Sequence, residues 1–219
     1  MNTEQLLMLL SGLAWSIVYV DSIRIGIKDK TYAMPFWPLA LNIAWELLHA
    51  ILGFREVGAS LQVIINAAWF RLDIGLLYPF FRYGRKYFPE NLRKRWFYGW
   101  VILGLLSAFL VQYAFIVEFG LWMGAVYSAF LQNLLMSILF IAMLNQRKSS
   151  EGQSMLIAIS KCIGTIAPTI LMGYIGIKPG LEPNYMVRVI GFLIAVFDLI
   201  YIWLLARKIT SEKKANLAR

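Results

Sequence analysis

Long blocks of apolar residues recur along the whole chain, separated by short polar segments. Each block is about 18 to 24 residues long, close to the length that a helix needs to cross a bilayer core of roughly 30 Å. Hydrocarbon offers no partner to an unpaired backbone group, so each block is expected to be helical. The pattern predicts seven transmembrane spans, at residues 5–24, 36–54, 60–81, 97–118, 122–145, 154–176 and 185–206.

These spans form one predicted unit, a transmembrane domain at 1–208 followed by a basic cytoplasmic tail at 209–219. The first block has neither a basic segment before it nor a small-residue cleavage site, so we expect a retained helix rather than a signal peptide. Pro168 is expected to kink the span at 154–176. The predicted fold class is an all-α polytopic membrane bundle.

Composition agrees with lipid as the solvent for most of the chain. Hydrophobic residues make up 60% and charged residues 15% of 219 residues, and mean hydropathy is +0.65, which leaves too little polar surface for a soluble globule. The single cysteine, Cys162, excludes an intrachain disulfide and argues against a cysteine-based metal site.

Basic residues are distributed unequally between the two predicted sides of the membrane. One side carries only Arg55, Lys178 and Arg188. The positive-inside rule therefore places the N-terminus outside and the C-terminus in the cytoplasm. A rim facing anionic lipid headgroups accounts for the net charge of +9 without nucleic acid. The cytoplasmic side carries Arg24, Lys28, Lys30, Arg82, Arg85, Lys86, Arg93, Lys94, Arg95, Arg147, Lys148, Arg207, Lys208, Lys213, Lys214 and Arg219.

Charged side chains inside the spans are the candidates for chemistry, because each costs at least about 2.5 to 3.5 kcal/mol near the bilayer centre. Three of them are acids and two are bases, so we expect one shielded carboxyl to keep its proton and to be a candidate general acid. They are Glu46, Arg71, Asp73, Lys161 and Asp198.

Helical spacing places several polar residues on shared faces. Asn42, Glu46 and His49 fall on one stripe of the second span. If the second and seventh spans are antiparallel, Glu46 and Asp198 lie at similar depth. We therefore expect one polar pocket inside the bundle, with further groups from Gln62, Asn66, Trp69, Asp73, Gln112 and Asn133.

Structural roles compete with functional ones for several of these groups. Arg71 and Asp73 can form an interhelical pair with Glu46, and Lys161 can snorkel to the cytoplasmic surface. Asp21 is expected at a wetted helix end, and His49 is expected to help Glu46 by a hydrogen bond. No basic residue lies within one turn of Glu46 or Asp198 on its own helix, which makes these two carboxyls the leading catalytic candidates.

Absent motifs narrow the chemistry further. The sequence has no DDxxD-like or NDxxD-like run to hold Mg²⁺ on a diphosphate, and no DxDD-type acid motif. It also lacks a P-loop, HExxH and GxSxG. Diphosphate ionisation and the common hydrolase chemistries are therefore not expected.

Two short runs carry a family resemblance. Asn42-Ile43-Ala44-Trp45-Glu46 in the second span and Phe197-Asp198-Leu199-Ile200-Tyr201 in the seventh are similar to the small integral membrane terpene cyclases of fungal meroterpenoid and indole-diterpene pathways and their bacterial relatives. The resemblance covers nearly the whole chain. It implies that Glu46 and Asp198 are needed for cyclisation, and the segment from Trp69 to Asp73 also looks similar.

The implied reaction is protonation of a terminal alkene or epoxide on a prenyl chain, expected to be farnesyl, attached to an indole or other aromatic molecule. Ring closure then proceeds through carbocations, as in an isomerase or lyase, without metal, cofactor or diphosphate. Aromatic rings can stabilise such cations through their faces. The supporting candidates are Asn42, Trp45, His49, Trp69, Asp73 and Tyr201, and the candidate lining rings are Trp15, Tyr19, Trp45, Trp69 and Tyr201.

Two other classes stay open from the sequence. A proton-coupled small-molecule transporter could use Glu46 and Asp198 as proton relays, although no internal repeat supports a transporter fold. A receptor or assembly factor would bind without turnover. The expected partners are a prenylated small molecule and the bilayer, which is the plasma membrane if the source is bacterial. Neither nucleic acid nor an obligatory protein partner is expected.

Overall fold

Polar residues cap the helices where the apolar blocks begin. Asn2 and Gln5 form a reciprocal capping box at the first helix, with Oδ1 of Asn2 accepting from the Gln5 amide at 2.8 Å. Ser60 and Ser154 cap two later helices more simply, each accepting one backbone amide through its side-chain oxygen. These caps satisfy amide hydrogens that would otherwise lack partners at the helix ends.

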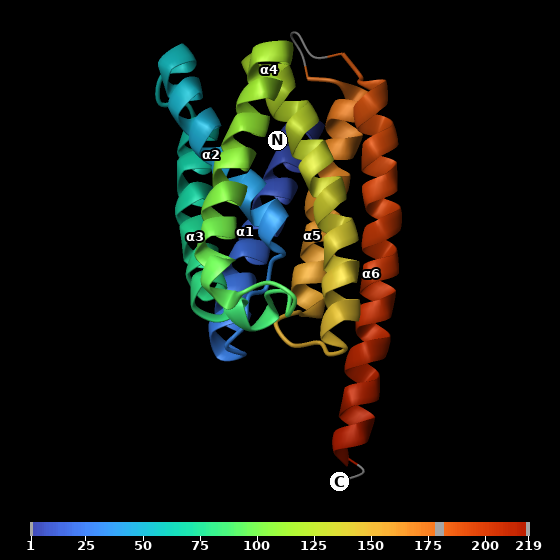
Figure 1. Ribbon diagram of the computed structural model, residues 1–219. Coiled ribbons are helices and arrows are strands. Elements are labelled where there is room, and N and C mark those ends of the chain that lie inside the picture. The colour runs from blue at the N-terminus through green and yellow to red at the C-terminus, as the bar shows by residue number, and fades with distance from the viewer. Residues whose placement is uncertain (1, 178–181, 218–219) are drawn as a thin grey trace.

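The chain folds into a bundle of long helices, described by a computed structural model over residues 2–177 and 182–217 (Figure 1). Lys178 and the last two residues of the predicted tail, 218–219, lie outside the described residues. The helices are α1 (Thr3–Lys28), α2 (Phe36–Val57), α3 (Leu61–Tyr83), α4 (Phe97–Arg147), α5 (Met155–Ile170) and α6 (Tyr185–Leu217), with 3-10 turns η1 (Gly84–Tyr87) and η2 (Lys94–Trp96) between α3 and α4.

The described residues confirm the all-α fold of a multi-pass membrane protein. Six helices are long and apolar enough to cross a membrane. α1 packs on α5 and α3, α2 packs on α3 and α4, and α6 packs on α4 and α5. α5 continues into a wider π-helical turn, η3 (Leu171–Ile175), just after Pro168, where the sequence predicts a kink.

The longest helix, α4, is interrupted at Gly120. Its backbone angles are φ 76° and ψ 167°, which lie outside the helical region. In Figure 1 the segment before the break and the segment after it run in opposite directions. They approach so closely that a Cβ on Gly124 would lie 2.6 Å from the carbonyl oxygen of Phe115. The break falls between the spans predicted at 97–118 and 122–145, while the count of seven stays a prediction.

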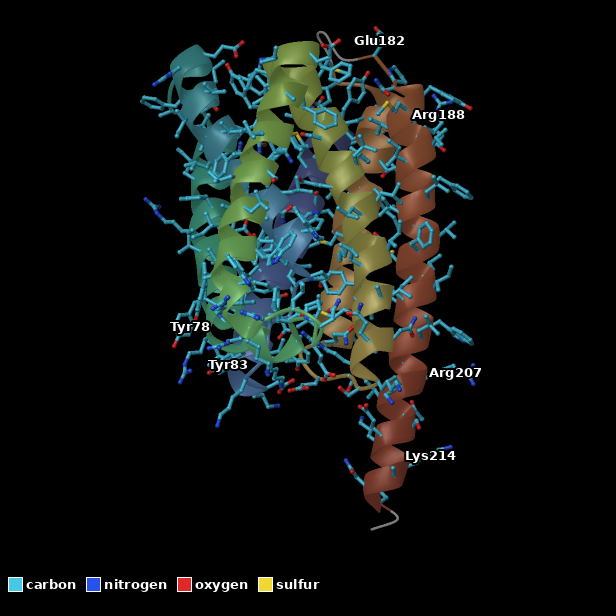
Figure 2. The ribbon with its side chains drawn as sticks, viewed as in Figure 1. Tyr78, Tyr83, Glu182, Arg188, Arg207 and Lys214 are labelled. Atoms are coloured by element: carbon cyan, nitrogen blue, oxygen red, sulfur yellow. The ribbon has the colours of Figure 1, made fainter. Side chains whose placement is uncertain are left out.

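Large apolar side chains cover the outside of the bundle, as lipid contact requires. Leu110 and Val117 of α4 are 71% and 67% exposed. Figure 2 shows Tyr78 of α3 and Arg207 of α6 pointing away from the bundle, and Lys214 on the part of α6 that extends past the other helices.

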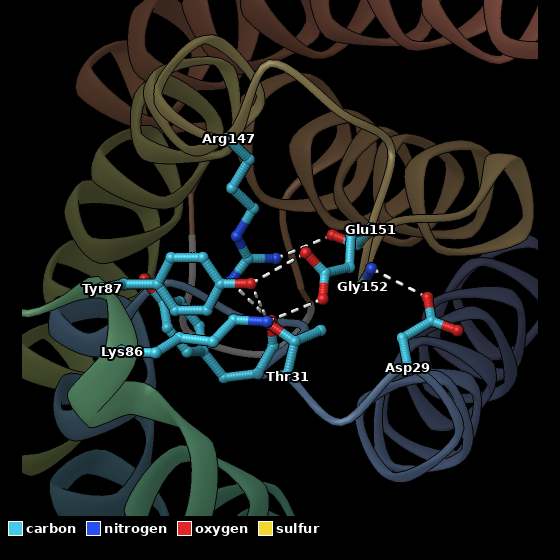
Figure 3. Close-up of polar contacts among 8 residues, drawn as sticks. Asp29, Thr31, Lys86, Tyr87, Arg147, Glu151 and Gly152 are labelled. Carbon is cyan, nitrogen blue, oxygen red and sulfur yellow. Dashed lines mark hydrogen bonds and ion pairs between the residues drawn. The ribbon is translucent and has the colours of Figure 1, made fainter.

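A polar cluster ties the connections together at one end of the bundle (Figure 3). Arg147, at the end of α4, donates to the backbone carbonyls of Glu151 at 2.8 Å and Tyr32 at 2.9 Å. Its guanidinium lies over the rings of Tyr32 and Tyr87, 4.3 and 4.6 Å from their centroids. Lys86 pairs with Glu151 at 2.8 Å. The connections that follow α1, α3 and α4 are thereby held to one another.

Candidate active site

Glu46 lies in a buried polar cluster built by α1, α2 and α3. Tyr19 of α1 donates its hydroxyl hydrogen to Oε1 of Glu46, and Nδ2 of Asn42 donates to the Tyr19 hydroxyl oxygen at 3.2 Å. The carboxyl of Asp73 on α3 is a close neighbour of the Glu46 carboxyl. Glu46 and Asp73 are 2% and 0% exposed. The structure therefore brings together three of the predicted site residues, Asn42, Glu46 and Asp73.

A chain of amide side chains continues from this cluster into α4. Oδ1 of Asn42 accepts from Nε2 of Gln132 at 3.0 Å, and Oε1 of Gln132 accepts from Nε2 of Gln112 at 2.6 Å. Nε2 of Gln112 also donates to the backbone carbonyl of Leu41 at 3.4 Å. Gln112 and Gln132 lie on opposite sides of the Gly120 break. This series of hydrogen bonds therefore links both halves of α4 to the Glu46 cluster.

In the described part of the chain, the Glu46 cluster contains two carboxyls and no cation. None of the ion pairs among residues 2–177 and 182–217 includes Glu46 or Asp73. Oε2 of Glu46 and both carboxyl oxygens of Asp73 are buried without a hydrogen-bond donor from these residues. Arg71 is exposed on α3, so the interhelical pair with Glu46 weighed from the sequence does not form.

Three aromatic rings stand in a row beside this cluster. The Tyr19 ring lies 6.3 Å from that of Trp15 and 6.1 Å from that of Trp69, measured between centroids. Nε1 of Trp69 donates to Oγ of Ser16 at 3.3 Å, which fixes the orientation of the indole. Trp69, predicted as a supporting residue, therefore lies next to Tyr19, and its supporting role stays a prediction.

Trp45 and His49 form a pair of their own on α2. Nδ1 of His49 lies 2.7 Å from the backbone carbonyl of Trp45, and the two rings are 4.5 Å apart. Nε1 of Trp45 donates to the carbonyl of Ala125 at 3.0 Å. Nε2 of His49 is buried without a partner among the described residues, so the predicted hydrogen bond from His49 to Glu46 does not form.

Asp198 belongs to a second buried cluster, between α5 and α6. Nζ of Lys161 lies 2.7 Å and 3.0 Å from the two carboxyl oxygens of Asp198 and donates to Oγ of Ser137 at 2.7 Å. Lys161 is 0% and Asp198 is 1% exposed. Lys161 therefore does not snorkel to the surface, because the Asp198 carboxylate compensates its charge inside the bundle.

Tyr201 lies one turn beyond Asp198 on α6. Its hydroxyl donates to Oε1 of Gln153 at 3.0 Å, and its ring lies 5.2 Å from that of Phe140. These contacts direct Tyr201 toward the connection between α4 and α5. Tyr201 is buried, but its hydroxyl contacts neither Glu46 nor Asp198 by a hydrogen bond in the described residues.

The polar groups form two clusters rather than the single pocket predicted from the sequence. Within the described ranges, no hydrogen bond or ion pair joins the Glu46 cluster to the Asp198 cluster. The surface hollow between α2 and α3 is lined by Leu47, Phe54, Arg55 and Phe70, among others, and by none of the predicted site residues. No three acidic, histidine or cysteine side chains gather as a metal-ligand set in the described ranges.

Several contacts of these clusters, and the burial of Asp21, were not predicted from the sequence. Tyr19 was predicted only as a lining ring, although its hydroxyl bonds Glu46, and Lys161 was not paired with Asp198. Asp21, predicted at a wetted helix end, is buried and accepts from Oγ of Ser154 at 2.5 Å. A signal for Tyr19 is present in the sequence, because Ser16 and Tyr19 are three residues apart and so place two hydroxyls on one face of the first helix.

Comparison with known proteins identifies a family that this chain resembles. The family described as Pyr4-like transmembrane terpene cyclases matches residues 1–208. The chain is 31% identical over 162 residues to the Pyr4-family terpene cyclase mfmH of Annulohypoxylon moriforme, covering 73% of this chain and 66% of that protein. It is 30% identical over 164 residues to terpene cyclase macJ of Penicillium terrestre, covering 72% and 62%. The matches thus span just under two thirds of these relatives. No solved structure matches the chain.

Proposed function

Because the chain belongs to the Pyr4-like transmembrane terpene cyclases, we propose that it cyclises the prenyl chain of a small molecule inside the membrane. The proposed reaction begins with a proton given by Glu46. The observation that carries this proposal is the burial of Glu46 beside a second carboxyl, with a tyrosine hydroxyl as its donor and no cation among the described residues in contact. The proposed substrate is a farnesyl group on an indole or another aromatic molecule.

The lack of a counter-charge from the described residues in the Glu46 cluster supports the acid role. An ionised carboxylate buried in a low-dielectric interior is costly unless a cation or several donors compensate it. Glu46 and Asp73 share one site with the Tyr19 hydroxyl as the donor. Two adjacent carboxylates would also repel each other. The favoured state therefore holds at least one proton, which is what a general acid needs.

Asp198 is in the opposite situation, which supports a different role. Lys161 donates to both of its carboxyl oxygens, so Asp198 is the acceptor in a buried ion pair. We propose that Asp198 orients neighbouring groups and stabilises positive charge electrostatically, and that it does not donate the proton. Supporting contacts with substrate are assigned to Asn42, Trp45, His49, Trp69, Asp73 and Tyr201.

The proposed reaction conserves atoms and charge. The O–H bond of Glu46 breaks as a C–H bond forms at the terminal alkene carbon, or as the proton passes to an epoxide oxygen whose C–O bond opens. The resulting carbocation is attacked by the π electrons of the next alkene, which forms the ring. A carbon beside the last cation then returns a proton to the carboxylate, so that product and substrate are isomers.

Aromatic faces next to the acid support the cationic steps. Trp15, Tyr19 and Trp69 stand in a row beside Glu46, and such rings attract a cation through their π faces. A bundle that excludes water also keeps a carbocation from being quenched. No metal or diphosphate takes part in the proposed reaction.

We further propose seven spans, with the N-terminus outside and the C-terminus in the cytoplasm. Counting α4 as two spans about Gly120 turns six membrane-length helices into seven. An odd number agrees with the chain ends marked toward opposite ends of the bundle in Figure 1. The basic residues near the C-terminal end, among them Arg207 and Lys214, support the cytoplasmic assignment.

The experiment that tests the function uses purified protein in detergent and farnesyl-indole substrates, with and without a terminal epoxide. The proposal predicts cyclic products of unchanged mass. A proton-coupled carrier would leave the substrate unaltered in detergent and would instead accumulate it in proteoliposomes. Uptake without chemical change would therefore contradict the cyclase and favour the carrier.

A further inference from the structure

Tyr19 stands between two groups whose hydrogen-bonding roles can be worked out from the structure. On one side Nδ2 of Asn42 approaches its hydroxyl oxygen at 3.2 Å, and on the other its hydroxyl meets Oε1 of Glu46. The ring is 2% exposed and packed between Trp15 and Trp69. The hydroxyl is therefore confined to these two polar neighbours.

The direction of the hydrogen bonds is set by a backbone carbonyl at the far end of the amide chain. The Leu41 carbonyl can only accept, so the group of Gln112 that faces it must be the NH2 group. That same NH2 donates to Oε1 of Gln132, whose NH2 in turn donates to Oδ1 of Asn42. The NH2 group of Asn42 is then the one that faces Tyr19.

Because Asn42 donates to Tyr19, the Tyr19 hydroxyl has its own hydrogen free for Glu46. A hydroxyl that accepted from both neighbours would leave this buried hydrogen without an acceptor, which is unfavourable. Oε1 of Glu46 is therefore an acceptor, a role that suits the carbonyl oxygen of a protonated carboxyl better than its hydroxyl oxygen. Oε2, which is buried and has no donor from the described residues, is the oxygen left to carry the acidic hydrogen.

We propose that Tyr19 is a positioning residue that keeps the acidic hydrogen of Glu46 on Oε2. The inference rests on the proposed function, in which Glu46 is the proton donor. A proton held on one defined oxygen is given in one direction, which matters when the acceptor is a single carbon or oxygen of the prenyl chain.

The variant that tests this role is Tyr19→Phe, which removes the hydroxyl and keeps the ring between Trp15 and Trp69. Cyclisation is expected to slow about 10- to 100-fold in kcat with little change in KM, because substrate contacts stay while the proton is no longer confined. Tyr113→Phe is the matched control, since Tyr113 is 54% exposed on α4. An unchanged kcat for Tyr19→Phe would overturn the proposal.

Infrared difference spectroscopy without substrate tests the same claim independently of turnover. The carboxyl C=O band that disappears in Glu46→Gln belongs to protonated Glu46. In Tyr19→Phe this band should move to higher wavenumber, because Oε1 has lost its donor, while Tyr113→Phe leaves it in place. A band at the same position in Tyr19→Phe would overturn the positioning role. If Tyr19→Phe fails to fold, Gln132→Met, which cuts the amide chain, should displace the same band, and an unmoved band there overturns the proposal.

The two measurements separate this inference from the function on which it rests. A band that shifts as expected, in a protein that cyclises none of the substrates, would support the proton placement and contradict the cyclase. Wild-type cyclisation with an unshifted band in Tyr19→Phe would support the cyclase and contradict the proton placement.

Discussion

At the residue scale, Glu46 and Asp198 are two buried carboxyls in opposite charge surroundings. Glu46 shares its site with Asp73 and accepts from Tyr19, whereas Asp198 is paired with Lys161 at 2.7 Å. Burial without a nearby cation favours the protonated form of a carboxyl, whereas a neighbouring ammonium group favours its ionised form. The two residues are therefore suited to different steps of one reaction.

The Lys161–Asp198 pair yields a stability prediction. Lys161→Met should lower the free energy of unfolding by about 3 to 5 kcal/mol, because it leaves the Asp198 charge buried without its partner. Unfolding by sodium dodecyl sulfate, followed by circular dichroism, measures the loss. The double variant Lys161→Met/Asp198→Leu removes both charges and should recover most of the stability. A single variant as stable as the wild type would refute the buried ion pair.

Glu151 gives a prediction about pH. This residue lies in the connection between α4 and α5, outside the spans. Burial opposes its charge, but hydrogen bonds from Lys86 and Tyr87 and the charges of Lys86 and Arg147 keep its pKa below the ordinary value of 4.5. A carboxyl whose pKa is lower in the folded state stabilises the fold above the unfolded-state pKa and loses that contribution as pH falls.

Thermal stability in detergent should therefore decline as pH falls below about 4.5, and Glu151→Gln should remove this part of the decline. The effect at neutral pH is expected to be no more than about 1 kcal/mol, since the ion pair is partly exposed and screened. Melting curves at several pH values measure it. A variant whose melting temperature has the same pH dependence as that of the wild type would contradict the role of Glu151.

Much of the Glu46 site was predictable from helical spacing, and its partners were not. Asn42 and Glu46 share a stripe because they are one turn apart on the same helix. The contacts of Glu46 with Tyr19, and of Lys161 with Asp198, depend on how separate helices are arranged in the bundle, α1 relative to α2 and α5 relative to α6. No local pattern fixes those arrangements, which is why Lys161 was expected at the surface and His49 beside Glu46.

At the element scale, α4 is one continuous run of apolar residues that turns back on itself. Gly120 makes this possible, because φ 76° with ψ 167° is a combination that only glycine adopts readily. A Cβ on Gly120 would meet no atom within 4 Å, so its requirement is conformational rather than steric. The hydropathy pattern predicted a break near this point, between the spans at 97–118 and 122–145, and the 51 residues of α4 exceed what one span needs.

Gly120→Ala should consequently destabilise the protein by about 1 to 3 kcal/mol. The matched control is Gly12→Ala in α1, where a Cβ would also meet nothing within 4 Å but the backbone is helical. That change should be neutral or stabilising by up to about 1 kcal/mol. Detergent unfolding of both variants measures the difference. Equal effects of the two substitutions would argue against the hairpin at Gly120.

At the scale of the whole molecule, the bundle separates an apolar exterior from two polar clusters inside. Arg207 and Lys214 lie toward one end of the bundle and Arg188 toward the other (Figure 2). The overall helical architecture followed from hydropathy alone, because block length and lipid as solvent leave few alternatives. The extension of α6 through Leu217, beyond the span predicted to end at 206, was not expected, since residues beyond the bilayer are no longer constrained by apolarity.

The orientation can be tested with introduced cysteines, because the natural Cys162 is buried. Ala59, between α2 and α3, and Ser211, on α6, are both exposed. Ala59→Cys should react with a membrane-impermeant maleimide added to intact cells, and Ser211→Cys should react only after the cells are lysed. The reverse pattern would invert the proposed topology, and labelling of both from outside would contradict an odd number of spans.

The central claim is that Glu46 gives the proton that starts cyclisation. Its most direct test is the rate of product formation from farnesyl-indole and its terminal epoxide by the wild type, Glu46→Gln and Glu118→Gln. Glu118 is an exposed glutamate on α4, so the control carries the same chemical change at a site outside the cluster. We expect Glu46→Gln to lose about 100-fold or more of the activity and Glu118→Gln to keep it. Full turnover by correctly folded Glu46→Gln would contradict the claim.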